Sequence, residues 1–260
     1  MCKMEINHFV RQENRKDYAM LELKNITWEI PDGEEIIKGI DLSVGDGRLI
    51  VVTGPNGGGK TTLAKLIAGI ETPSAGEIIF DGKDITDCDV TERAKSGIAF
   101  AFQQPVRFKG LTVRDLLELA AGETLSEHAA CDLLGKVGLC ANEYLERELN
   151  ASLSGGEMKR IEIASVLARK AKLSIFDEPE AGIDLWSFSR LVETFEELRR
   201  NQSGTLLVIS HQERILNIAD EIIVIADGRV RSAGNRADIL PSLLTDEKTP
   251  LCPLGKEERR

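Results

Sequence analysis

A glycine-rich octapeptide in this chain has the residue types and the spacing needed to hold phosphate groups. It fits the pattern G-x-x-x-x-G-K-[S/T] and consists of Gly54, Pro55, Asn56, Gly57, Gly58, Gly59, Lys60 and Thr61. Glycines let successive backbone N–H groups turn toward a polyphosphate, which also meets the positive end of the following helix. The lysine reaches the terminal phosphates, and the hydroxyl after it ligates Mg²⁺. The octapeptide therefore predicts binding of a nucleoside triphosphate with Mg²⁺.

The segments around this loop are those that must position it. An apolar run at 49–52 is typical of a buried strand, and the segment 62–68, beginning with Thr62, has the pattern of a helix. Further along, expected strands alternate with expected helices; the strands are 97–102, 172–176, 205–210 and 221–226, and the helices 155–170, 184–200 and 212–218. This alternation predicts an α/β fold with a mostly parallel sheet that binds its ligand at the carboxyl ends of the strands.

Two other regions depart from the alternation. Residues 21–30, 36–44 and 77–80 read as strands separated by turns, and 110–150 is helical in pattern. We therefore expect one domain at 20–245, with a helical subdomain inserted at about 104–156. Residues 1–19 would be a flexible extension, or would not be translated if Met20 is the start, and 246–260 a tail.

The bulk properties exclude several classes of protein. With 260 residues, 42% of them hydrophobic, the chain can bury a sizeable core, and its net charge of −10 argues against general nucleic-acid binding. No apolar run approaches the roughly 18–20 residues of a membrane span, nor does the N-terminus have a signal-peptide core. Five scattered cysteines without a C-x-x-C pair indicate reduced thiols and give a shared metal site no support. We expect a cytoplasmic protein.

Three downstream motifs complete a recognisable set. Leu153-Ser154-Gly155-Gly156-Glu157 is followed by an apolar strand that ends in Asp177-Glu178, and the strand 205–210 ends at His211. Together with the octapeptide, which is a P-loop, these motifs resemble those of the ATP-binding-cassette (ABC) ATPases. The resemblance covers 20–240. It implies an ABC cassette fold: a mostly parallel core sheet, an antiparallel β subdomain and an inserted helical subdomain.

The acidic pair has a chemical interpretation that the resemblance supports. A buried strand would deliver Asp177 beside the P-loop, where it can hold Mg²⁺ through water, and Glu178 would polarise the attacking water as general base. The resemblance adds Gln103 as a contact to Mg²⁺ and water, with Gln104 as the competing candidate, and places His211 against the γ-phosphate. It also assigns Asp184, which ends the D-loop 181–184, to the nucleotide site.

The segment after Leu153 suggests a second phosphate contact. Ser154 and Glu157 form an S-x-x-E helix cap, yet Gly155 and Gly156 each cost a helix about 0.8–1 kcal/mol. Glycines there make sense if a phosphate approaches the helix N-terminus closely. Because the P-loop already holds this chain's phosphates, the second site must serve another nucleotide. The family resemblance identifies Ser154-Gly155-Gly156 as the signature motif. It implies a head-to-tail dimer that sandwiches two ATP molecules between the P-loop of one chain and the signature motif of the other.

The sequence defines the residue that would contact the adenine base less clearly than the residues that would bind phosphate. ABC ATPases often stack an aromatic residue on adenine after the first strand, where this chain has Ile30. Trp28 shares a strand face with Ile30 and could substitute, or it could belong to the core.

Two partner types remain. Lys60 and Ser154 lie too close in the sequence for the long coiled coil of chromosome-maintenance relatives, and translation-factor relatives carry two cassettes. Four segments resemble the ATPase of SUF iron–sulfur cluster assembly: 101–106, 157–160, 178–184 and 210–216. They imply a soluble scaffold protein as partner. Two features instead fit a transporter subunit: the shortness of the segment 110–150, and the sequence Gly110-Leu111-Thr112-Val113 at its start. The partner of such a subunit would be a permease, and the subunit would lie at the inner face of the membrane. We expect the SUF role, with the transporter role as the alternative.

Overall fold

The computed structural model describes residues 19–31, 33–150, 152–202 and 204–246. The expected extension 1–19 and tail 246–260 lie outside these residues, apart from Ala19, where the first strand begins, and Asp246, where the last helix ends. Within the described residues, no helix is long and apolar enough to cross a membrane.

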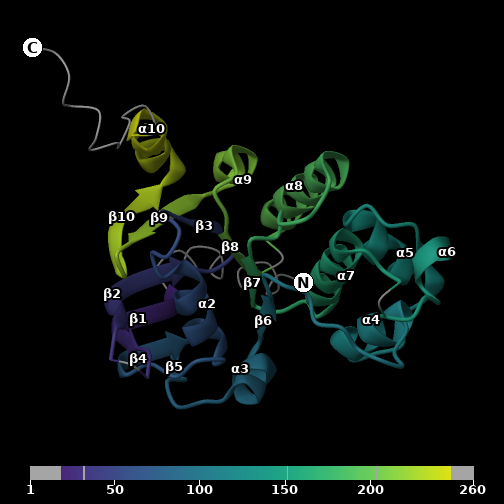
Figure 1. Cartoon of the computed structure of the whole chain (residues 1–260), viewed down its shortest axis with the longest axis horizontal. Helices are drawn as coiled ribbons and strands as arrows, with labels where there is room; N and C mark the ends of the chain where they lie inside the picture. Colours follow the sequence, from purple (N-terminus) through teal and green to yellow (C-terminus); the bar gives the residue numbers. More distant parts are fainter. Residues whose placement is uncertain (1–18, 32, 151, 203, 247–260) are drawn as a thin grey trace, which may run out of the picture.

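A six-stranded sheet forms the centre of the fold (Figure 1). Its order is β10-β9-β3-β8-β7-β6, and its strands are β3 (Leu49–Thr53), β6 (Ile98–Ala101), β7 (Leu173–Asp177), β8 (Thr205–Ile209), β9 (Glu221–Ala226) and β10 (Arg229–Asn235). All neighbours pair in parallel except β10, which is antiparallel to β9. The carboxyl ends of five strands therefore meet at one edge, as the alternation of segments predicted.

A second sheet is entirely antiparallel and has the order β2-β1-β4-β5. It contains β1 (Ala19–Glu29), β2 (Glu35–Gly45), β4 (Ala75–Phe80) and the short β5 (Lys83–Asp84). This sheet and α2 (Lys60–Ala68) lie together on one side of the core sheet (Figure 1).

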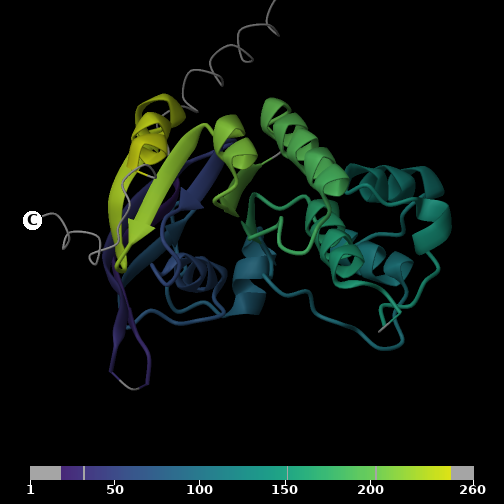
Figure 2. The same cartoon turned by 45° about the horizontal axis from the view of Figure 1, so that its top comes forward.

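The remaining helices fall into two groups. Between β6 and β7 the chain forms α4 (Val113–Ala121), α5 (Glu127–Lys136), α6 (Ala141–Tyr144) and α7 (Gly155–Ala168). They form a lobe beside the core in both views (Figures 1 and 2). The others are α3 (Val90–Ser96), α8 (Leu185–Arg200), α9 (Glu213–Ile218) and α10 (Arg236–Asp246). The antiparallel sheet, the mixed core sheet and the helical lobe confirm the predicted cassette fold.

Two apolar cores lie on the two faces of the central sheet. Because strand side chains alternate, Leu49 and Val51 pack with the helical lobe, whereas Ile50 and Val52 pack with α2 and the antiparallel sheet. Each parallel strand is therefore buried on both faces, which fixes the pairing register of the strands. The fixed register in turn sets where the loops that follow the strands begin.

The sequence patterns did not predict α3, β10 or α10. Helix α3 has a capping box from Asp89 and Glu92 but is mostly exposed, so it has no apolar stripe to detect. Strand β10 is an edge strand that alternates between exposed and half-buried residues, and α10 carries Pro241 in its interior. The P-loop helix also begins earlier than expected, at Lys60 rather than Thr62.

Candidate active site

The P-loop joins β3 to α2 in a conformation that only glycine permits. At Gly54, φ is +130° and an added Cβ would lie 2.1 Å from the carbonyl oxygen of Ile225. At Gly59, φ is +101° at the start of α2. The glycines thus allow the loop to curl over the helix N-terminus against β9, as a phosphate cradle requires.

Lys60 is held inside this curl. Its side chain is buried, and Nζ donates to the carbonyl oxygens of Gly54 at 2.8 Å and Pro55 at 2.9 Å. Burial lowers the pKa of Lys60, while Glu178 and Asp177 oppose that change. An ammonium held by two loop carbonyls at the mouth of a glycine-rich loop is well placed to receive a polyphosphate.

Thr61 lies on α2, just after β3, and Asp177 ends β7. The two residues meet although β8 lies between β3 and β7. The Thr61 hydroxyl donates to Asp177 Oδ1 at 3.2 Å, and Asp177 is 1% exposed at the end of β7. Asp177 Oδ2 is buried and has no hydrogen-bond donor among the described residues, and burial raises the Asp177 pKa. A hard cation prefers such oxygen ligands, and it would satisfy the orphaned oxygen. These residues fit a Mg²⁺ ion that also binds phosphate oxygens and water.

Glu178 lies at the meeting point of three loops. It adopts a left-handed backbone, with φ +45°, and its N–H donates to Ile209 O at 3.0 Å. Gln103 Nε2 donates to Glu178 Oε2 at 2.7 Å, and His211 Nε2 lies 3.8 Å from Oε1. Of the two candidate glutamines, Gln103 is the one that hydrogen-bonds Glu178. The loops after β6, β7 and β8 therefore bring together the three side chains predicted to be catalytic.

The N-terminus of α7 is capped within the chain. Ser154 Oγ accepts from Glu157 N at 3.2 Å, and Glu157 Oε2 accepts from Ser154 N at 2.7 Å. Tyr144 donates its hydroxyl proton to Glu157 Oε1. The Tyr144 hydrogen bond and the two Ser154 bonds lower the pKa of Glu157 to about 2. This rigid cap leaves Gly155 open, since an added Cβ there would meet nothing within 4 Å.

The predicted D-loop packs against the same motif. A Cβ at Gly156 would lie 2.6 Å from the carbonyl oxygen of Gly182. Asp184 is the N-cap of α8: Oδ1 accepts from Trp186 N and Ser187 N, and Oδ2 accepts from the Ser187 hydroxyl at 2.7 Å. The hydrogen bond from Ser187 N is the largest cause of a lowered Asp184 pKa. Sequence reasoning assigned Asp184 to the nucleotide, whereas within one chain its oxygens cap a helix.

Comparison with known proteins shows the family of the chain. The family model described as "ABC transporter" matches residues 37–181.

The chain belongs to this ABC transporter family of ATPases.

An uncharacterized ABC transporter ATP-binding protein of Methanocaldococcus jannaschii is 39% identical, over 79% of this chain and 85% of that protein. A probable ATP-dependent transporter of Cyanophora paradoxa, ycf16, is 32% identical, over 83% of this chain and 88% of its own length. A solved ATP-binding cassette, dimeric and bound to ADP and Pi after hydrolysis, has a TM-score of 0.74 and 26% identity. That comparison covers 84% of this chain and 99% of the other.

Three charged residues of this ABC ATPase were not foreseen as parts of the site, and the first two lie on α7. Lys159 of α7 is 1% exposed, and its Nζ donates to the carbonyl oxygens of Phe102, Gln103 and Asp177. Glu162, one turn on, accepts from Phe102 N at 2.9 Å. The signature helix therefore holds the ends of β6 and β7. Only the presence of charged residues on an otherwise apolar helix signals this in the sequence.

Glu180, immediately before the predicted D-loop, is also an unexpected part of the site. Its Oε1 accepts from the Ser210 hydroxyl at 2.6 Å, and Ser210 Oγ in turn accepts from Gln212 N at 3.0 Å. Burial is the main cause of a raised Glu180 pKa. This chain of hydrogen bonds links the loop after Glu178 to the loop that carries His211.

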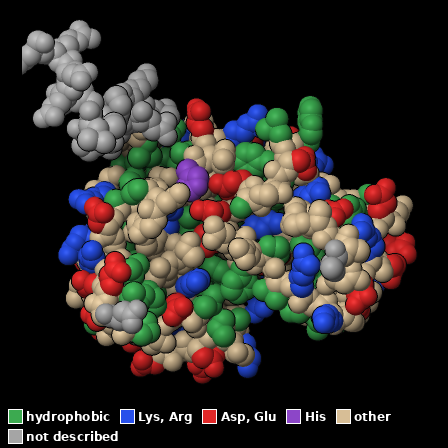
Figure 3. All heavy atoms as spheres, in the orientation of Figure 1, with side chains coloured by type: hydrophobic (Ala, Val, Ile, Leu, Met, Phe, Trp, Pro, Cys, Tyr) green, Lys and Arg blue, Asp and Glu red, His purple; other side chains and the backbone are tan. Residues whose placement is uncertain are grey.

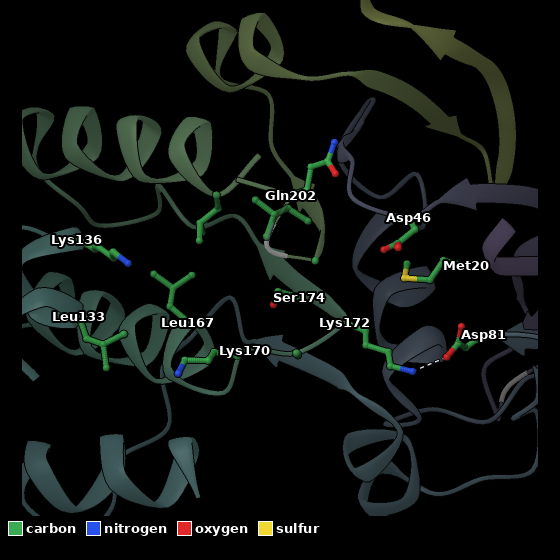
Figure 4. A pocket seen from close by; sticks show the side chains of 14 residues that line it. Met20, Asp46, Asp81, Leu133, Lys136, Leu167, Lys170, Lys172, Ser174 and Gln202 are labelled. Carbon is green, nitrogen blue, oxygen red and sulfur yellow. Dashed lines mark hydrogen bonds and ion pairs between the residues drawn. The ribbon is translucent and has the colours of Figure 1, made fainter. Parts of the chain in front are cut away.

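A cavity of about 820 Å³ lies elsewhere in this ABC ATPase (Figure 4). It is lined by Ser174 and Leu206 near the amino ends of β7 and β8, by Lys172 and by Leu167. Figure 4 shows Lys172 paired with Asp81 at one side of the lining. The cavity is thus at the opposite end of the strands from the P-loop and is separate from the nucleotide site.

Proposed function

We propose that this ABC ATPase is the ATP-binding subunit of a membrane transporter, and that it hydrolyses MgATP as a head-to-tail dimer. One observation carries the proposal: Gln103 and His211 converge on Glu178 beside the Thr61–Asp177 pair, whereas the N-terminus of α7 is left open at Gly155. A single chain thus has a nearly complete hydrolytic site and an anion site that its own P-loop does not use.

The roles of the side chains follow from their positions. Lys60 exchanges its two loop carbonyls for the β- and γ-phosphates. Thr61, Asp177 and Gln103 would hold Mg²⁺, which neutralises phosphate charge. Glu178 polarises the attacking water, and Gln103 keeps that carboxylate oriented through its amide. His211, 3.8 Å from Glu178, supports the γ-phosphate.

The second half of the site comes from the other copy. Ser154, Gly155 and Gly156 of one chain meet the γ-phosphate bound by its partner copy, and Asp184 lies in the loop behind them. Closure of the dimer is then linked to ATP binding and reopening to hydrolysis, so a binding cycle becomes a motion.

The segment 102–108, which contains Gln103, is suited to receive the transporter's membrane-embedded permease. Phe102, Val106 and Phe108 are exposed there by 37%, 46% and 39%. Figure 3 shows that, on the face it draws, hydrophobic side chains are interspersed with acidic and basic ones. Because Lys159 binds the Phe102 and Gln103 carbonyls, a partner on this segment would be mechanically connected to α7.

The names of both relatives described above contain the word transporter, which favours a permease as the partner. The SUF scaffold is the second candidate, favoured by the segments 101–106, 157–160, 178–184 and 210–216. It requires the same ATPase cycle but a soluble partner.

Purification of the tagged chain from its native cells, separately from membrane and soluble fractions, tests the choice. Mass spectrometry should find a polytopic membrane protein in stoichiometric amount with the membrane fraction. A soluble scaffold in stoichiometric amount would overturn the transporter role and establish the SUF role. The Glu178→Gln variant serves as the matched bait, since it should hold ATP without turnover.

A further inference from the structure

Two large hydrophobic side chains are exposed on the first turn of α8. Leu185 is 63% exposed and Trp186 84%, the largest exposure among the large hydrophobic residues that the structure describes. The buried stripe of α8 contains Phe188, Leu191 and Phe195. Trp186 lies roughly 200° around the helix from Phe188, on the side where a surface helix normally carries polar residues. The core of this chain therefore does not account for an aromatic residue at this position.

The backbone that carries Trp186 is held rigidly. Its N–H donates to Asp184 Oδ1 at 3.1 Å, and the next residue is bonded to both oxygens of the same carboxylate. A side chain on a capped helical turn loses little backbone freedom on binding, which favours its use as an anchor.

The surface around Trp186 continues into the proposed dimer face on both sides. On one side the D-loop places the Gly182 carbonyl against Gly156 of the signature motif. On the other, Arg214 Nη1 donates to Ser189 Oγ at 2.7 Å, which brings α9 and the loop of His211 next to α8. An exposed apolar pair thus lies between two motifs that face a nucleotide.

We propose that Leu185 and Trp186 form an apolar anchor that docks on a second copy of this chain when ATP is bound. The inference rests on the proposed head-to-tail dimer and names a contact in it that involves no nucleotide. A similar cassette has been solved as a dimer, which supports a second copy as the occupant. Tryptophan is enriched among the residues that dominate interface energies.

Tryptophan fluorescence tests the anchor directly, because the chain has only two tryptophans. In a Trp28→Phe, Glu178→Gln protein, Trp186 is the sole emitter and bound ATP is not consumed. We expect the emission to shift to the blue on adding ATP but not ADP, at the protein concentration at which light scattering shows the dimer mass. Emission that is already blue-shifted without nucleotide would mean that another segment covers Trp186, and would overturn the proposal.

A mutant series then measures the contribution of the anchor. In the Glu178→Gln background, Trp186→Ala should raise the protein concentration needed for ATP-dependent dimerisation at least about tenfold. Trp186→Phe should restore part of that loss. Leu119→Ala is the matched control, since Leu119 is 68% exposed on α4, away from this face. ATP binding by the monomer should be unchanged in all of them.

The outcomes separate this inference from the proposed function. If ATP produces the dimer but Trp186 emission does not change and Trp186→Ala dimerises normally, the anchor is wrong and the dimeric ATPase stands. If the parent Glu178→Gln protein forms no dimer with ATP at any concentration, the proposed head-to-tail mechanism itself fails, and the anchor fails with it.

Discussion

The P-loop and the signature motif are the two places where we propose that a helix N-terminus meets phosphate, and they differ in how much of each site a single chain supplies. At α2, Lys60 is buried and bonded, and Thr61 already contacts Asp177. At α7, the cap satisfies the helix internally and the surface at Gly155 is open. The first site is preorganised within one chain, whereas the described residues of the same chain leave the second open at Gly155. Catalysis in such a protein can be controlled by association rather than by chemistry.

The largest effect on function should come from a substitution in the P-loop, the more complete of the two phosphate sites. Lys60→Ala removes the ammonium that faces the phosphates, so we expect ATP affinity to fall by two orders of magnitude or more, as loss of a charged phosphate contact implies. Isothermal titration calorimetry with ATP measures it, and Lys95→Ala, an exposed lysine on α3, is the control. Unchanged ATP binding would contradict the assignment of the P-loop.

The next effect separates binding from chemistry within the same half. Glu178→Gln keeps the shape and a hydrogen-bond partner for Gln103 but removes the base. Turnover should fall by about 10²–10⁴ while ATP affinity is retained, and the protein should accumulate as a closed dimer. Phosphate release assays measure turnover and light scattering measures the dimer, with Glu213→Gln on α9 as control. A normal rate of hydrolysis in the variant would rule out Glu178 as the base.

The proposed phosphate contact at the N-terminus of α7 can be tested by substituting two neighbouring glycines. Gly155→Ala meets nothing within 4 Å in one chain, so thermal stability and ATP binding should be preserved. Its methyl group would obstruct only an approaching phosphate or second copy, and hydrolysis should fall about tenfold or more, since 1.4 kcal/mol of lost transition-state contact is a factor of ten. Gly156→Ala should also lower thermal stability, because its Cβ collides with Gly182 O. Full activity in Gly155→Ala would show that α7 does not meet a phosphate.

The smallest effect concerns the cap behind that surface. Tyr144→Phe removes the hydroxyl that bonds Glu157 and should cost about 1 kcal/mol of unfolding free energy at pH 7. The Glu157 pKa is lowered from 4.5 to about 2, so its stabilisation is present above pH 4.5 and is lost as the pH falls toward 2. Urea unfolding between pH 7 and 3 should show a weaker acid-side loss in Tyr144→Phe than in the parent. Parallel curves would exclude the Tyr144–Glu157 bond as the cause.

The parts of the fold that the sequence predicted are those with strong local signals. The buried parallel strands follow from runs such as 49–52, and the motif residues fall at their carboxyl ends because a parallel sheet places them there. The Gln103–Glu178 contact confirms that the loops after β6 and β7 meet.

What the sequence missed depends on tertiary context. Lys159 and Glu162 read as ordinary polar residues of a helix. Only the packing of α7 against β6 and β7 shows that both bind backbone groups and that Lys159 is buried. The N-cap role of Asp184 was masked by the motif that contains it. Strand β10 has too few apolar residues to be detected, because an edge strand is defined by its neighbour rather than by its own pattern.

The lysine at the junction of α7 with the core has a mechanical consequence. Lys159 holds the ends of two strands through one small ammonium group, which has three N–H bonds on a flexible stem and lacks the fixed plane of a guanidinium. Any rotation of the helical lobe would therefore act on the ends of β6 and β7, beside Gln103 and Asp177, so a partner bound to the lobe would reach the site through this one ammonium group.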